Sequence, residues 1–196
     1  RLTRMFGLAV LATLAMSAVA ASAASAAEFR HEAGAGVKAR IKAHNVGAHS
    51  FTAGIIGTIE CQKATFTGEF VTSPQKTVTV TPVYEECEFL GFSVKVTMHK
   101  CKYRFNEPTG SGPFTGTVNV VTCPKTEPIE FEANGCKIHV FEQGPLSTVT
   151  FTNLATSPKS VEIEAAVSNI AYEAFGSCAL VGLLGDGEYS GVALAD

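Results

Sequence analysis

Hydrophobic and polar residues alternate along most of the chain, and the alternation is clearest from Val94 to Phe105. Two alternating runs in this segment are joined by His99 and Lys100. Alternation with a period of two predicts a half-buried strand, and a two-residue joint predicts a tight hairpin. Pairing the two arms across this joint would place apolar residues opposite one another on the core face. It would also place Lys95 opposite Arg104 on the polar face.

The same pattern returns over residues 129–140, where the joint is Asn134-Gly135. An Asn-Gly pair is a strong hairpin signal, because a type I′ turn needs two consecutive residues at positive φ. Cys101 and Cys136 hold equivalent places in the two predicted hairpins. Each begins the second arm and faces the core.

Further alternating runs predict the remaining strands, and no segment has a convincing helical period. The sequence therefore predicts about ten strands in an all-β, antiparallel fold. The additional predicted strands cover residues 37–44, 51–70 (two strands broken near Cys61), 77–84, 114–123, 147–152, 160–166, 169–175 and 188–195.

The N-terminal segment has the features of a secretory signal peptide. Arg1 and Arg4 precede an apolar run over residues 5–16, and an Ala-Ser-Ala sequence ends at Ala26. This order of a positive start, an apolar run and small residues is typical of a cleaved signal. A membrane anchor is the alternative, but the second half of the segment is only weakly apolar. We therefore expect residues 1–27 to be a signal peptide and residues 28–196 to be one secreted or cell-surface domain with no membrane span.

The charge balance of the expected mature domain argues against a nucleic-acid-binding protein. Removing Arg1 and Arg4 from the 15 basic side chains leaves 13 against 18 acidic ones, a net charge of −5. Nucleic-acid binders carry a basic surface, so nucleic acid is not an expected partner.

Six cysteines in an exported chain predict three disulfides. Their spacing favours Cys87–Cys101, Cys123–Cys136 and Cys61–Cys178. In a simple meander these partners would lie two strands apart, about 10 Å, which exceeds disulfide reach. This connectivity therefore favours a β-sandwich, in which such strands can face each other across the core, and a closed β-barrel is the alternative fold. A rival bridge, Cys101–Cys136, would join the two hairpins without that crossing. The six cysteines are Cys61, Cys87, Cys101, Cys123, Cys136 and Cys178.

Sequence motifs for nucleophilic, phosphate or metal chemistry are absent, so no catalytic residue, cofactor or metal is predicted. The histidines match no standard ligand spacing, which indicates solvated surface positions. The densest carboxylate cluster is Glu85, Glu86 and Glu88, and a pair about 5–10 Å apart would suit glycoside hydrolysis. Beside a cysteine and a turn, the cluster instead favours a solvated loop. The histidines are His31, His44, His49, His99 and His139.

The polar face of the first predicted hairpin is basic and is the candidate binding surface. Lys95, Lys102 and Arg104 lie on this face. Like charges directly opposite each other are unfavourable, and an acidic partner would offset their repulsion. Acidic cell-wall polymer or another surface protein is the expected partner, and a solvated basic face without a partner is the alternative.

Three recurring features carry a resemblance: the paired cysteines, the Asn134-Gly135-Cys136 turn, and aromatic-Thr/Ser-Gly strand starts at Phe66, Phe114 and Tyr189. Together with the signal peptide, they resemble uncharacterised secreted, cysteine-containing, β-rich proteins of soil actinobacteria. The resemblance implies export, disulfides and an all-β fold, and it carries no activity.

Three functions remain open. We expect a secreted structural or interaction module without catalytic activity. The alternatives are a small-ligand-binding barrel and a hydrolase that acts on an extracellular polymer through glutamates. A filled core would favour the first function, a closed barrel with an apolar cavity the second, and a cleft with paired carboxylates the third.

Overall fold

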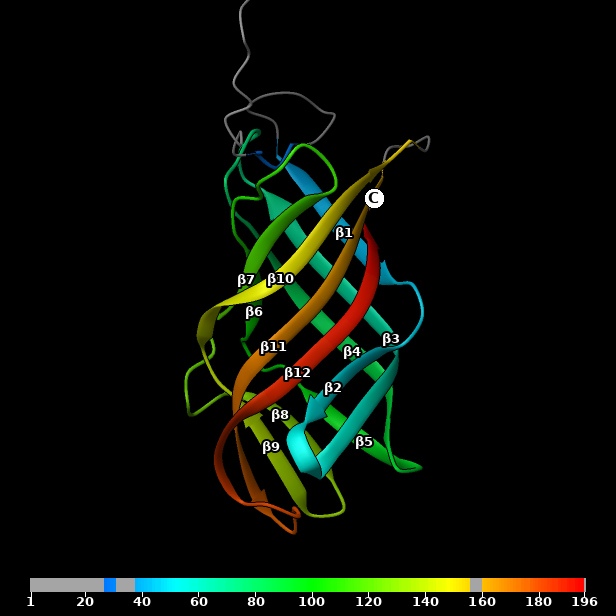
Figure 1. Ribbon diagram of the computed structural model, residues 1–196, viewed down its shortest axis with the longest axis vertical. Helices are drawn as coiled ribbons and strands as arrows, with labels where there is room; N and C mark the ends of the chain where they lie inside the picture. Colours follow the sequence, from blue (N-terminus) through cyan, green and yellow to red (C-terminus); the bar gives the residue numbers. More distant parts are fainter. Residues whose placement is uncertain (1–26, 31–37, 156–159, 196) are drawn as a thin grey trace, which may run out of the picture.

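The computed structural model describes residues 27–30, 38–155 and 160–195, so the predicted signal peptide lies almost wholly outside the described residues. The described chain contains twelve β-strands, one short 3-10 turn at Gly54–Ile56 and no α-helix (Figure 1). The strands are β1 (Ala39–Asn45), β2 (His49–Ala53), β3 (Gly57–Phe70), β4 (Val78–Phe89), β5 (Phe92–Thr97), β6 (Lys102–Phe105), β7 (Phe114–Val121), β8 (Ile129–Ala133), β9 (Cys136–Val140), β10 (Gln143–Leu154), β11 (Ser160–Gly176) and β12 (Gly182–Ala195).

The strands form a closed, antiparallel, up-and-down barrel with eight positions around its wall. Four positions are single long strands, β3, β4, β11 and β12, and each of these strands runs the length of the barrel. Each of the other four holds two strands in series: β1 then β2, β5 then β6, β7 then β8, and β9 then β10. The barrel closes where β12 pairs with β1 and β2. The chain therefore forms the barrel that was the alternative, and not the favoured sandwich.

The interrupted strands divide the barrel into two halves along its axis (Figure 1). We call the half that contains β1, β6, β7 and β10 the upper half, and the half that contains β2, β5, β8 and β9 the lower half. In each half the eight positions form a complete ring of hydrogen-bonded neighbours.

The first predicted hairpin does not form, although its inward and outward faces are correct. β5 and β6 do not pair with each other, because both pair with β4, at opposite ends of that long strand. The hairpin turn lies instead at Leu90-Gly91, where both residues have positive φ and Phe89 pairs with Phe92. At the predicted joint only His99 has positive φ. The joint is therefore a break within one barrel position.

The second predicted hairpin is confirmed residue by residue. β8 and β9 pair with Ile129 opposite Val140 and Ala133 opposite Cys136. Asn134 and Gly135 have φ values of 47° and 77°, as a type I′ turn requires.

All six cysteines form disulfides, but none of the predicted pairs is correct. The bridges are Cys61–Cys87, Cys101–Cys123 and Cys136–Cys178. Each joins barrel positions that are adjacent in the wall, with Cα–Cα distances of 3.9, 4.4 and 4.5 Å. The favoured pairs and the rival Cys101–Cys136 are wrong because the barrel decides which strands are neighbours, and disulfide geometry requires close Cα atoms.

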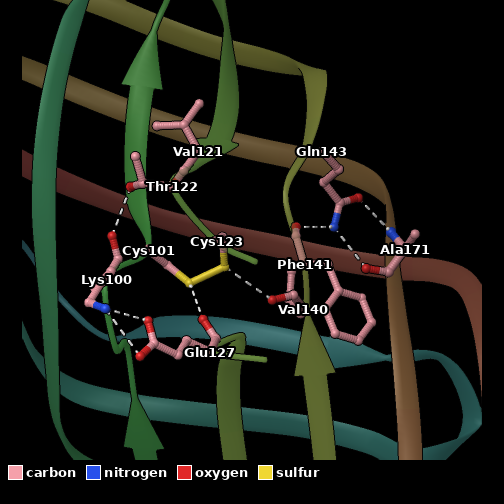
Figure 2. Close-up of a disulfide and its surroundings, with 10 residues drawn as sticks. All are labelled: Lys100, Cys101, Val121, Thr122, Cys123, Glu127, Val140, Phe141, Gln143 and Ala171. Atoms are coloured by element: carbon pink, nitrogen blue, oxygen red, sulfur yellow. Dashed lines mark hydrogen bonds and ion pairs between the residues drawn. A yellow bond between two sulfur atoms is a disulfide. The ribbon is translucent and has the colours of Figure 1, made fainter. Parts of the chain in front are cut away.

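Where a strand is interrupted, side chains form hydrogen bonds to backbone groups that have no backbone partner on a neighbouring strand. Thr122 Oγ1 donates to the Lys100 carbonyl at 2.8 Å, beside the Cys101–Cys123 disulfide (Figure 2). The Gln143 amide bonds both the N–H and the carbonyl of Ala171 at 2.8 Å. Such bonds matter because an unpaired buried backbone group is costly. These side-chain hydrogen bonds therefore close the barrel wall at the breaks between strands.

The lower half of the barrel is filled by packed side chains. The rings of Phe51 and Phe131 stack with their centroids 4.9 Å apart, and Tyr172 packs edge-on against Phe51. Tyr172 has no exposed surface, and its hydroxyl donates to Asp186 Oδ1 at 2.8 Å. The packed rings of Phe51 and Phe131 therefore form a floor beneath the upper half.

Candidate functional site

The upper half of the barrel encloses a cavity of about 1000 Å³. Inward-facing residues of the upper-half strands form most of its wall, and β2, β8 and β9 contribute residues such as His49, Phe51 and Phe131 at its lower end. Aromatic rings make up much of the lining, including Phe66, Phe105, Phe114 and Phe151. A barrel of eight strands is wide enough to hold one small ligand when side chains do not fill it. The cavity has the size and the apolar character of small-molecule sites in proteins.

The segment Ala27–Arg30 lies at the upper end of the cavity and lines it. Phe29 exchanges two backbone hydrogen bonds with Gln75, at 2.9 and 3.0 Å. The Phe29 ring also meets the Phe151 ring edge-on, with centroids 5.3 Å apart. This segment is thus attached to the barrel at its upper end.

Four polar side chains of the lining lie together, and we call them the Tyr–His cluster: His49, Tyr84, Tyr103 and Tyr189. Charged residues also line the cavity, among them Glu28, Arg30 and Arg40. His49 Nδ1 lies 2.5 Å from the Tyr189 hydroxyl, and His49 Nε2 lies 2.9 Å from the Val192 carbonyl oxygen. The Tyr84 hydroxyl lies 2.9 Å from that of Tyr189 and 3.2 Å from that of Tyr103. The four side chains therefore form one continuous hydrogen-bonded chain.

Burial keeps the Tyr–His cluster uncharged. Burial lowers the pKa of His49 below its ordinary value of 6.5, and the hydrogen bond to the Val192 carbonyl opposes this only in part. Burial also raises the pKa of Tyr103 to about 12 and raises those of Tyr84 and Tyr189. Loss of water disfavours the charged form of each group. At neutral pH the cavity therefore presents a neutral imidazole and three neutral phenols.

A glycine makes room for the His49 ring. A Cβ at Gly191 would lie 2.4 Å from His49 Nδ1, so only glycine permits this approach. A Cβ at Gly116 would likewise lie 3.2 Å from the Phe151 ring. Two of the three aromatic-Thr/Ser-Gly sequences thus place a glycine beneath a ring from a neighbouring strand.

The sequence contained a signal for the position of His49 that the histidine spacing did not reveal. The residues of β2 alternate, with His49, Phe51 and Ala53 all buried. The prediction of a solvated His49 is wrong, because this alternation places the ring on the inward face, where it is 3 % exposed. The prediction for His31 lies outside the described residues.

The predicted basic surface is not a single hairpin face. Lys95, Lys102 and Arg104 all point away from the core, but Lys95 belongs to β5 and the other two belong to β6. Lys95 pairs in register with Glu132 of β8, whereas Arg104 lies between Thr79 and Asn119. Lys95 and Arg104 therefore do not oppose each other. Binding of an acidic partner by these residues stays a prediction.

The glutamate cluster lies on the outer surface of the barrel. Glu85, Glu86 and Glu88 are exposed residues of β4, and Glu86 forms an ion pair with Lys63 of β3 at 2.5 Å. Among the described residues, no group of three His, Cys, Asp or Glu side chains is placed to hold a metal ion.

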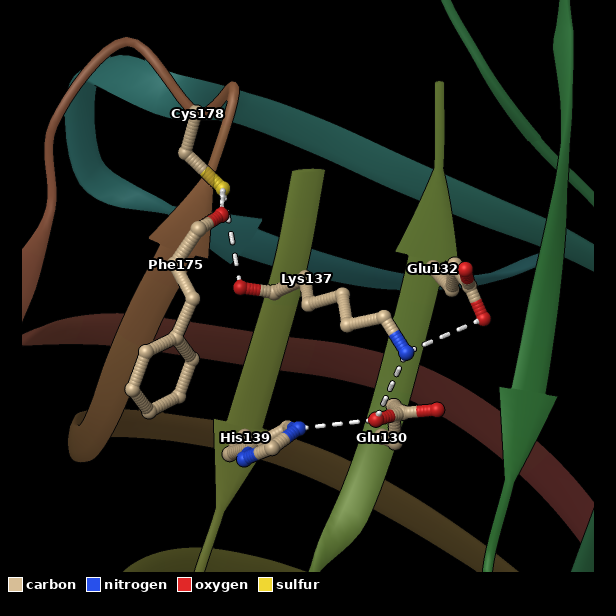
Figure 3. A network of polar contacts seen from close by, with 6 residues as sticks. All are labelled: Glu130, Glu132, Lys137, His139, Phe175 and Cys178. Carbon is tan, nitrogen blue, oxygen red and sulfur yellow. Dashed lines mark hydrogen bonds and ion pairs between the residues drawn. The ribbon is translucent and has the colours of Figure 1, made fainter. Parts of the chain in front are cut away.

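A second polar network lies on the outer face of β8 and β9 (Figure 3). His139 Nε2 and Glu130 Oε2 are 2.8 Å apart, and Lys137 Nζ contacts both Glu130 and Glu132. The hydrogen bond from His139 lowers the pKa of Glu130, and the Phe175 ring packs on His139 at 4.8 Å. These contacts connect β8, β9 and β11 and lie outside the cavity.

Comparison of the chain with protein-family models, curated proteins and solved structures finds no match. In the part of the chain that the structure describes, no helix is long and apolar enough to cross a membrane.

Proposed function

We propose that this protein binds a small, mainly apolar molecule inside the upper half of the barrel. The observation that carries this proposal is the mainly apolar cavity of about 1000 Å³ with the hydrogen-bonded Tyr–His cluster in its wall. Ligand sites typically combine an apolar lining with a few polar groups that orient the ligand. The apolar body of the ligand would contact the phenylalanine rings, and its polar end would lie at the Tyr–His cluster.

The cavity favours this function over the structural or interaction module. A module that acts only through its outer surface has no use for a hollow core, and an empty apolar space loses packing contacts. The lower half shows that this chain can fill a barrel ring with side chains. The hollow upper half therefore supports a ligand-binding role.

Three disulfides agree with a carrier that works outside the cytoplasm. All six cysteines are bonded, and such bridges persist in oxidising compartments. With the N-terminal sequence pattern, this supports a secreted or cell-surface ligand carrier.

The test is binding of N-phenyl-1-naphthylamine, a neutral apolar dye whose fluorescence rises in apolar surroundings. Ala165 lines the cavity and Ala166 is exposed on the outer face of the same strand, β11. We expect the wild type to bind the dye, Ala165→Phe to bind it at least tenfold more weakly, and Ala166→Phe to match the wild type. Equal binding by the two variants, or no binding by the wild type, would refute the proposal.

A further inference from the structure

The direction of the hydrogen bonds in the Tyr–His cluster identifies the polar group that a ligand needs. This inference rests on the proposed ligand-binding function and deepens it. His49 Nε2 faces the Val192 carbonyl oxygen at 2.9 Å. A carbonyl oxygen only accepts hydrogen bonds, so Nε2 carries a proton.

The other ring nitrogen of His49 is an acceptor. The ring is 3 % exposed, and within the described residues its side-chain partner is the Tyr189 phenol, with no carboxylate in contact. A buried imidazolium without a counter-charge is unfavourable, so the ring is neutral. A neutral imidazole with a proton on Nε2 has a lone pair on Nδ1.

This assignment determines the direction of the remaining hydrogen bonds. Tyr189 must donate its only proton to His49 Nδ1, and its oxygen therefore accepts from Tyr84. The geometry alone also admits Tyr84 as donor to Tyr103 at 3.2 Å, but a phenol has one proton and Tyr84 gives it to Tyr189 at 2.9 Å, so Tyr103 donates to Tyr84. The order of donation is Tyr103 to Tyr84 to Tyr189 to His49.

The chain of donors ends at the oxygen of Tyr103. All three phenol protons are used inside the Tyr–His cluster, whereas the Tyr103 oxygen accepts no hydrogen bond from a described residue. Tyr103 lines the cavity, so its side chain lies within reach of a bound molecule. At this position the cavity offers an acceptor and no donor.

We propose that the ligand is an apolar alcohol whose hydroxyl group donates a hydrogen bond to the Tyr103 oxygen. The class includes long-chain alcohols and other apolar molecules with one hydroxyl group. An ether or an ester of the same size has no proton to donate. A carboxylate at the same place would meet only oxygen lone pairs.

The test compares two ligands with the same number of heavy atoms, dodecan-1-ol and 1-methoxyundecane, as competitors of N-phenyl-1-naphthylamine at neutral pH. We expect the wild type to bind the alcohol roughly tenfold more tightly than the ether, as one additional hydrogen bond allows. Tyr103→Phe removes the acceptor, so it should weaken alcohol binding about tenfold and leave ether binding unchanged.

A matched variant and the wild-type ratio separate the possible outcomes. Tyr172→Phe removes a buried phenol outside the cavity lining, and it should keep the preference for the alcohol. Equal affinity of the wild type for both ligands would overturn this inference and leave the proposed function standing. Failure of both ligands and the dye to bind the wild type would refute the proposed function as well. The ratio of the wild-type affinities for dodecan-1-ol and 1-methoxyundecane tests this inference even if Tyr103→Phe does not fold.

Discussion

Substituting Gly191 with alanine tests the geometry of the Tyr–His cluster directly. The new Cβ would lie 2.4 Å from Nδ1 of His49 and 2.6 Å from its Cγ, whereas ordinary van der Waals contact begins at 3.4 Å. The ring would therefore have to move by about 1 Å. It is held on both sides, by Tyr189 at 2.5 Å and by the Val192 carbonyl at 2.9 Å, so a movement of this size breaks or lengthens both hydrogen bonds.

The expected cost follows from three contributions. Overpacking a filled site costs about 1–3 kcal/mol, and each hydrogen bond that is lost costs about 1 kcal/mol. Alanine lowers the entropy of the unfolded chain, which returns about 0.4–1 kcal/mol. We therefore expect Gly191→Ala to lower the free energy of unfolding by about 2–5 kcal/mol. For a domain of this size, that loss lowers Tm by about 4–20 °C.

The assay is urea denaturation with thermal melting, using Gly185→Ala as the matched control. Gly185 also lies in β12, but a Cβ there meets no atom within 4 Å, so the control should be neutral or slightly stabilising. The double variant with His49→Ala should remove most of the cost of Gly191→Ala, because the clashing ring is gone. A Gly191→Ala protein as stable as the control would show that the His49 ring does not lie over this glycine.

Three further predictions concern charge, disulfides and the outer surface. Burial lowers the pKa of His49 in the folded state, so its contribution to stability is fully present above pH 6.5 and is lost as the pH falls through the folded-state pKa. In urea denaturation across this pH range, His49→Gln should reduce the slope of the free energy of unfolding against pH, whereas His44→Gln, at an exposed position, should not. Equal slopes for the two variants would contradict the assignment. Replacing Cys136 and Cys178 together with serine should lower the free energy of unfolding by about 3–4 kcal/mol, because this bridge joins residues 42 positions apart; an unchanged urea midpoint would argue against the bridge. Exposed charges are screened by salt, so binding of acidic cell-wall polymer by Lys95, Lys102 and Arg104 should be sensitive to salt in a pull-down and should be lost when all three residues are replaced with serine. Binding retained by the triple variant would exclude these residues as the binding surface.

Most strands and their inward and outward faces could be predicted from the sequence, although the two strands expected over residues 160–166 and 169–175 are one strand, β11. Alternation placed Val94 and Tyr103 inward and Lys95 and Arg104 outward, although the proposed pairing of their strands was wrong. It also predicted the Asn134-Gly135 turn with its register. These features are local, because a side chain's face depends on the period of its own strand, and a tight turn depends on the φ preferences of two residues.

The neighbours of most strands could not be predicted from the sequence and follow from the closed barrel. Backbone hydrogen bonds are chemically alike for every strand pair. Alternation therefore does not say whether the strand that contains Val94 pairs with β6, as predicted, or with β4, as it does. The length of β4 settles this, because it offers separate segments to β5 and β6. The same neighbour relations set the disulfides, since Cys61 and Cys87 become register partners only when β3 pairs with β4.

The candidate site depends on closure of the barrel. His49, Tyr84, Tyr103 and Tyr189 come from four different strands, β2, β4, β6 and β12, and the sequence separates Tyr189 from His49 by 140 residues. Alternation alone can assign each of them to the inward face. Their meeting requires β12 to pair with β2, because only a closed wall brings the last strand back beside the first ones and encloses the space between their side chains.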